Sequence, residues 1–139
     1  MAFTYELTET IDPSALRDIV NNTGADIGPS LLVTGSYDAA SLPAAVSDPV
    51  IAVTRDTAKG TGTNLHGRAA IRGLLQVTAG SGGFTKGQRL MPEANTGKAI
   101  PWTVAGGSNA TIIGIAQQTV AANAVGLVEF NATGQFGQG

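Results

Sequence analysis

The residue best suited to catalysis is His66, the only histidine in the chain, within the run T-N-L-H-G-R. A histidine that acts as a general base needs a nucleophile and an orienting carboxylate close to it. No serine or acidic residue near His66 has the spacing of a nucleophile elbow. We therefore expect His66 to be an exposed or interface loop residue, and we expect the chain not to be an enzyme.

Phosphate-binding and metal-binding motifs are also incomplete. Gly97-Lys98 is followed by Ala99 rather than serine or threonine, and Pro92 stands where the first glycine of a Walker loop belongs. With no cysteine, the chain has neither disulfides nor a thiolate metal site, and one histidine with scattered carboxylates is no metal signature. We expect no cofactor and no metal ion.

Trp102 is the one tryptophan of the chain and lies in the run K-A-I-P-W-T. Aromatic residues make up only 5% of the sequence. A lone large aromatic side chain in such a chain is typical of a core anchor or of a hot spot in an interface. We favour a core or oligomer-interface role for Trp102 over a platform for a ligand.

The composition favours one domain of short strands and turns. The chain has 139 residues, enough for one continuous core, and its nineteen glycines indicate many turns. Charged residues make up 13%, about half of the typical share. A surface with so little charge is suited to extensive protein contact and is compatible with a homo-oligomer.

The charge distribution argues against nucleic acid and membranes as partners. The formal net charge is −2, and acidic residues outnumber Arg17 in the first 26 residues, so a basic nucleic-acid arm is absent. The sequence contains no apolar run of about 18 residues and no signal-peptide pattern. We expect a soluble protein made in the cytoplasm of its host.

The N-terminal residues 1–24 are predicted to form an extended arm and a short helix. Phe3, Tyr5 and Leu7 alternate with polar residues, which gives an extended segment one apolar face. This segment is either a partner-binding arm or the first strand of the protein's own sheet. In residues 12–20, Asp12 is a helix cap and Pro13 suits the first helical position, while Leu16, Ile19 and Val20 would share one face.

Residues 25–130 are predicted to form a β domain, and residues 131–139 a flexible tail. Within the domain, residues 111–130 hold two runs of β-branched residues that predict a hairpin, with Asn123 in its turn. The segment 39–46 is ambiguous, because its alanines favour a helix whereas Pro43 would break one. The candidate strands, separated by glycine, proline and small polar residues, are 30–34, 50–54, 69–78, 88–91, 111–116 and 125–130.

The sequence also resembles itself, in a way that favours two copies of one structural unit. Segments in the first part of the domain can be paired, in the same order, with segments in the second part. Each copy shows a glycine before a strand, an apolar-proline pair, a β-branched run and a further run. The paired segments are 26–32 with 85–91, 41–44 with 99–102, 50–54 with 112–116, and 70–75 with 124–129.

Roughly residues 70–130 resemble the small capsid decoration, or cement, proteins of tailed double-stranded DNA phages. Two departures from that family's pattern are visible. The turn glycine is shifted in Ala124-Val125-Gly126, and residues 1–26 have no clear counterpart. The resemblance is carried by the order and spacing of F-T-K-G-Q-R-L-M at 84–91, N-T-G-K-A-I-P at 95–101, I-G-I-A at 113–116, A-A at 121–122 and V-G-L-V at 125–128.

The resemblance implies a compact β-tulip or β-barrel-like domain that assembles as a homotrimer. Such a protein would sit on the outer surface of the virion and clamp neighbouring subunits of the major capsid protein against the pressure of packaged DNA. Phe3, Tyr5 and Leu7 are then candidates for capsid contact, for example by strand addition. The alternative is a small β module that binds a ligand or glycan in a phage tail or receptor-binding apparatus.

Overall fold

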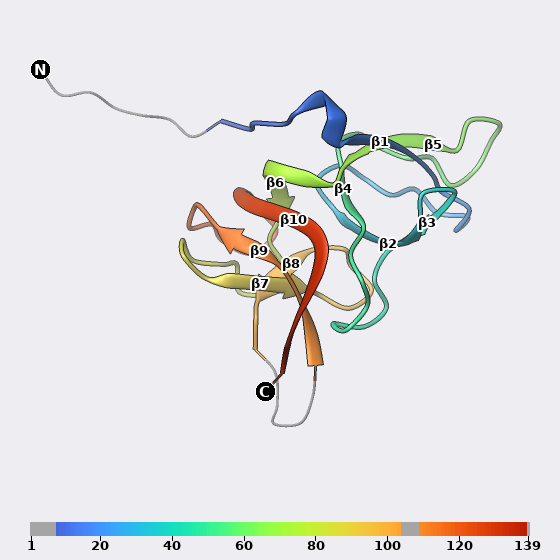
Figure 1. The fold of residues 1–139 in the computed structure, drawn as a ribbon. Helices are drawn as coiled ribbons and strands as arrows, with labels where there is room; N and C mark the ends of the chain where they lie inside the picture. Colours follow the sequence, from blue (N-terminus) through green and yellow to red (C-terminus); the bar gives the residue numbers. More distant parts are fainter. Residues whose placement is uncertain (1–7, 104–108, 139) are drawn as a thin grey trace, which may run out of the picture.

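The structure is a computed structural model that describes residues 8–103 and 109–138, with side chains through residue 132. Within these residues the chain is nearly all β and forms two curled antiparallel sheets, each of five strands. Figure 1 shows the first sheet at the right and the second at the left. The prediction of an all-β, barrel-like domain is therefore confirmed.

The first sheet has the strand order β1-β5-β4-β2-β3. Its first and last strands approach each other, since a parallel bridge joins Asn21, just after β1, to Ala40 in β3. The sheet therefore curls on itself around a small apolar interior. Its strands are β1 (Leu16–Val20), β2 (Leu32–Ser36), β3 (Ala39–Ser41), β4 (Ala52–Thr54) and β5 (His66–Ala70).

The second sheet has the order β6-β10-β9-β7-β8, and it curls in the same way. A parallel bridge joins Ala79, just after β6, to Ala99 in β8. Its strands are β6 (Arg72–Thr78), β7 (Arg89–Pro92), β8 (Ala99–Pro101), β9 (Asn109–Ala116) and β10 (Val125–Gln138).

The two sheets have the same topology, which confirms the predicted duplication. Strands β6 to β10 follow in the second sheet the order that β1 to β5 follow in the first. The registers correspond as well, because the pair Ile19–Gly67 has its equivalent in Val77–Gly126. The isolated bridge Ile27–Ala58 likewise has its equivalent in Phe84–Val120.

Three of the four segment pairs read from the sequence match equivalent strands, and the fourth is wrong. The first three pair β2 with β7, β3 with β8 and β4 with β9. The fourth pairs residues 70–75, which include most of β6, with β10, whereas the structural equivalent of β10 is β5. The structural equivalent of β6 is β1.

The predicted helix over residues 12–20 is wrong beyond its first turn. Asp12 does cap a turn, since its side chain accepts a hydrogen bond from the backbone N–H of Ser14 at 2.9 Å, but only a short 3₁₀ turn over Pro13–Ala15 follows. From Leu16 onward the chain is β1, which pairs antiparallel with β5. β-branched residues suit this strand, and the backbone of β5 satisfies its hydrogen bonds.

The hairpin predicted in residues 111–130 is confirmed, and the predicted tail differs from what is observed. β9 and β10 pair antiparallel, and Asn123 has a φ of 65° in the connection between them. β10 does not end at Phe130. After an irregularity in register, its backbone continues to Gln138 and pairs with the first half of β9. The strands β1, β3 and β8 have no counterpart among the predicted strands.

The two halves share one apolar core. The smaller cluster lies within the first sheet and includes Ile19, Ile27 and Val33. The larger cluster fills the second sheet and also takes in residues of the first. Backbone hydrogen bonds cross the same junction, from Leu32 N to Gly97 O and from Asn95 N to Pro43 O, both at 2.7 Å. The halves therefore form a single packed body.

Glu93 holds the long turn between β7 and β8 in place. Its carboxylate accepts hydrogen bonds from Ser81 N and Thr96 Oγ1, both at 2.9 Å. Gly80 leaves room for the carboxylate, because a Cβ there would lie 2.7 Å from Glu93 Oε2. The backbone N–H of Ser81, followed by the Thr96 hydroxyl, lowers the pKa of Glu93 from its ordinary value of 4.5.

A lowered pKa predicts how the Glu93→Gln variant responds to pH. The carboxylate stabilises the fold fully above pH 4.5, and this contribution is lost as the pH falls through the lowered pKa. We expect Glu93→Gln to be less stable than the original chain at neutral pH, with a difference that shrinks below pH 4.5. Urea unfolding across this range measures the difference. A difference that stays constant with pH would contradict the assigned role of the carboxylate.

Candidate interaction surfaces

One row of side chains crosses the first sheet and is covered by the second half of the chain. The register pairs Leu16 with Ala70, Ala70 with Val53, and Val53 with Leu32. All four residues belong to or pack against the larger apolar cluster, and the last three are fully buried. We call these four residues the covered row. It is the face by which the first sheet packs on the second.

The equivalent row of the second sheet is exposed at three of its four positions, and the segment before β1 pairs with the fourth, Leu74. It consists of Leu74, Glu129, Ile115 and Arg89, paired in the same registers. Glu129 and Arg89 are exposed, and Ile115 is 44% exposed, while Leu74 is half-buried. We call these four residues the open row. It places an apolar side chain between an acidic and a basic one.

Trp102 extends the open row beyond Arg89. The guanidinium of Arg89 lies over the indole ring, 5.3 Å from its centroid, and the indole Nε1 donates a hydrogen bond to Ala110 O at 3.4 Å. Trp102 is half-buried, so it lies at the margin of the packed core. The geometry is that of a cation–π contact, which fixes the direction of the Arg89 side chain. Sequence reasoning singled out Trp102 but not Arg89 or Ile115.

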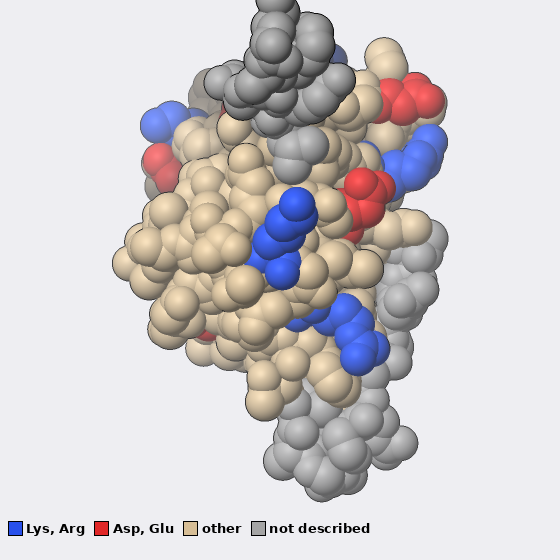
Figure 2. Space-filling view, turned by 90° about the vertical axis from the view of Figure 1, so that its left-hand side faces the viewer, with Lys and Arg blue, Asp and Glu red and all other residues tan. Residues whose placement is uncertain are grey.

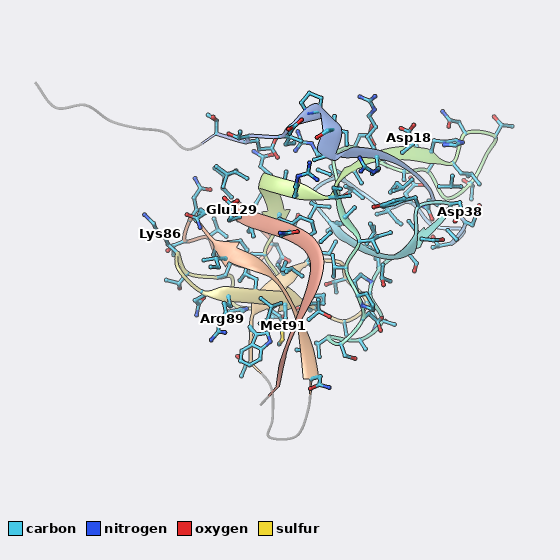
Figure 3. All side chains as sticks on the ribbon, viewed as in Figure 1. Asp18, Asp38, Lys86, Arg89, Met91 and Glu129 are labelled. Atoms are coloured by element: carbon cyan, nitrogen blue, oxygen red, sulfur yellow. The ribbon has the colours of Figure 1, made fainter. Side chains whose placement is uncertain are left out.

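A second exposed feature is the turn Tyr37-Asp38, which joins β2 to β3. Tyr37 is 41% exposed, and Asp38 is exposed as well. Figure 3 shows Asp38 on the opposite side of the molecule from Glu129 and Arg89. The equivalent turn of the second half, residues 93–98, packs on the first half through Gly97 and Asn95. The turn Tyr37-Asp38 is therefore the uncovered counterpart of a turn that makes contact within the chain.

The segment that precedes β1 is held against the second sheet. Thr10 exchanges two backbone hydrogen bonds with Leu74, and Ile11 packs against the larger cluster. Glu9 forms an ion pair with Arg55 and also accepts a hydrogen bond from Gln76 N at 2.8 Å. These contacts anchor the chain from Glu9 onward. The predicted capsid-contact residues Phe3, Tyr5 and Leu7 lie outside the described residues.

Three hollows of the described surface have linings of both polar and apolar residues. One, of about 240 Å³, lies beside Glu9 and Gln76. Two others, of about 390 and 300 Å³, are both lined by Arg72, and the smaller of these two is also lined by Tyr37. Trp102 lines none of the three. A ligand site around Trp102, as the binding-module alternative requires, is not among these hollows.

The residues with catalytic or ligating potential are scattered. His66 is exposed, as expected, but it is the first residue of β5 and pairs with Val20, so the prediction that it lies in a loop is wrong. Among the residues that the structure describes, no three histidine or acidic side chains are grouped to hold a metal ion. Within the same residues, no helix is long and apolar enough to cross a membrane.

The side of the molecule that carries Glu129, Lys86 and Arg89 has little charge. Figure 2 shows it as a broad surface of mainly uncharged residues with a few basic and acidic side chains, and Figure 3 labels these three side chains on that side. No model of a known protein family matches the chain, and no curated protein matches it either. The functional argument is therefore based on the surfaces described above.

Proposed function

We propose that this chain is a structural virion protein of a tailed phage, a decoration protein that binds the outer surface of the capsid shell as a homotrimer. The major capsid protein is its partner, and it needs no cofactor and no nucleic acid. The main support is the open row, in which the exposed apolar side chain of Ile115 lies between Glu129 and Arg89 on a weakly charged side of a body that is otherwise well packed. Protein interfaces commonly combine apolar contacts with a rim of polar and charged residues.

The choice of the major capsid protein as the partner is based on the resemblance of residues 70–130 to phage decoration proteins. These residues contain most of the second half, from β6 into β10, which also bears the open row. The proposed mechanism is mechanical rather than chemical. Two halves that share one core form a stiff unit, and a stiff unit bound across neighbouring capsid subunits resists their separation under the pressure of packaged DNA.

The N-terminal residues are the proposed capsid-binding arm. The chain is anchored to the domain at Glu9 and Thr10, so changes in residues 1–7 leave the anchoring contacts in place. Phe3, Tyr5 and Leu7 would supply alternate apolar side chains along a capsid strand, while backbone hydrogen bonds would supply affinity. This role is independent of the open row.

Replacing the apolar side of this arm tests its role. The variant Phe3→Ser, Tyr5→Ser, Leu7→Ser is expected to sediment with empty shells of the major capsid protein from the same genome at least about tenfold more weakly than the original chain, because its apolar contacts are lost. The control variant Thr4→Ser, Glu6→Gln changes the other side of the arm and is expected to bind normally. Both should have the same melting temperature as the original chain. Equal binding by the two variants would exclude the arm as a capsid contact.

A further inference from the structure

The covered row and the open row occupy equivalent positions in the two halves but differ in burial. In the first half, the covered row packs against the second half, whose turn 93–98 reaches across to Leu32 and Pro43. In the second half, three of the four residues of the equivalent open row are exposed. A head-to-tail series of such modules ends with one row left open and, at the other end, one turn left free. These are the open row and the turn Tyr37-Asp38.

From this continuity we propose that copies of the chain associate head to tail, with the turn Tyr37-Asp38 of one copy seated on the open row of the next. The contact would repeat between copies the one that already joins the two halves within a copy. Figure 3 places Asp38 and the pair Arg89 and Glu129 on opposite sides, as a head-to-tail contact requires. The inference rests on the proposed function and deepens it, because it names the contact through which three copies would close into a ring.

The side chains at the two ends are complementary in charge and polarity. Arg89 takes the position of Leu32, whose backbone N–H donates a hydrogen bond to Gly97 O in the turn 93–98. An Asp38 carboxylate arriving there would face the Arg89 guanidinium, which Trp102 already holds in place. Tyr37 would lie against Ile115, and a partly exposed aromatic residue is a common interface anchor. These contacts would cover two of the largest exposed apolar side chains.

The residue types in the two rows also differ in the way that this contact requires. The covered row is wholly apolar, with Ala70 and Leu32 at the positions that Glu129 and Arg89 occupy in the open row. A permanently buried face needs apolar residues, whereas a face that is exposed until a copy arrives needs charges to stay soluble. Ile115 keeps the apolar character of Val53 at the centre of the row. A heterologous contact of this kind forms closed rings or open chains.

Single-cysteine variants test the contact, because the chain has no cysteine of its own. Tyr37→Cys and Ile115→Cys are purified separately, mixed and oxidised, in solution and on capsid shells. We expect a disulfide between positions 37 and 115 in the mixture, and little linkage when either variant is alone. Val125→Cys, at a residue that is 46% exposed but outside the row, replaces Ile115→Cys as the matched control. Linkage no greater than in this control, or linkage mainly between like positions, would overturn the proposal.

A charge exchange provides a second, independent test. Asp38→Arg and Arg89→Asp are each expected to weaken self-association by about tenfold or more in light scattering, because each places like charges together. The two changes combined in one chain are expected to restore association to within a few-fold. A double variant no better than the single variants would overturn the proposal.

The same samples separate failure of this contact from failure of the proposed function. Shells that bind the chain, without linkage between positions 37 and 115 in solution or on the shell, would reject the head-to-tail contact and leave the decoration role standing. Linkage between these positions, with no sedimentation on shells, would support the contact and reject the decoration role.

Discussion

Val53→Asp is expected to prevent folding of the whole chain. Val53 is fully buried at the centre of the covered row, where the halves meet. An aspartate there would bury a carboxylate without a partner, which costs several kcal/mol. The loss is comparable to the total stability of a domain, about 5–15 kcal/mol. Circular dichroism and urea unfolding of the purified variant would measure it, and a cooperative transition close to that of the original chain would contradict the described core.

Ile115→Asp is the matched control for this prediction, because Ile115 occupies the equivalent position in the second half. Its side chain is already 44% exposed, so the carboxylate would keep its contact with water. We expect this variant to fold with a change in stability of no more than about 1 kcal/mol. Equal loss at the two positions would mean that the halves are not packed as described. The pair therefore measures which row is covered and which is open.

Gly114→Ala is expected to lower the free energy of unfolding by about 2–4 kcal/mol. Gly114 has a φ of 156° and pairs with Phe130 at the end of the regular β9–β10 register. A Cβ at this position would lie 2.0 Å from Glu129 O, so the neighbouring strand would have to move. The equivalent residue of the first half is Ala52, which has no positive φ. The requirement for glycine therefore comes from the local irregularity of β9 and β10.

Thermal and urea unfolding would test this prediction against Gly28→Ala. A Cβ added at Gly28 meets no heavy atom within 4 Å, and its backbone needs no positive φ. Replacement there is expected to change stability by less than about 1 kcal/mol. Similar effects at the two glycines would show that the close approach of β10 to β9 does not hold.

The central hairpin could be predicted because its signal is local. β-branched residues of the two runs and an Asn123 suited to positive φ stand close together in sequence, and the structure realises both. The duplication was visible for the same reason, since three of its segments keep a similar order of glycine, proline and β-branched residues. Signals of this kind lie within short segments, so they can be recognised in a single sequence.

β1 was mistaken for a helix because its signals are ambiguous. Leu16, Ile19 and Val20 have the spacing of a helical face, and Asp12 and Pro13 form a genuine N-terminal turn. What decides the conformation is the pairing of β1 with β5, about 50 residues later, which local pattern does not reveal. β3 and β8 were missed because three residues are too few to show a period.

The open row could not be identified from the sequence alone. Arg89, Ile115 and Glu129 are far apart in the chain, and only the register of three strands brings them together. One usable signal was present, namely that the two copies differ in polarity at equivalent positions. It could be read only after the strand order had shown which positions are equivalent.

The melting temperature of capsid shells tests the decoration role most directly. Empty shells of the major capsid protein would be heated alone and with saturating amounts of the full chain, and shell disruption followed by light scattering. If the chain clamps neighbouring subunits, the shells should melt several degrees higher with it, because a ligand that binds only the intact shell stabilises it by mass action. Shells that bind the chain but melt at an unchanged temperature, or that do not bind it at all, would contradict the proposed role.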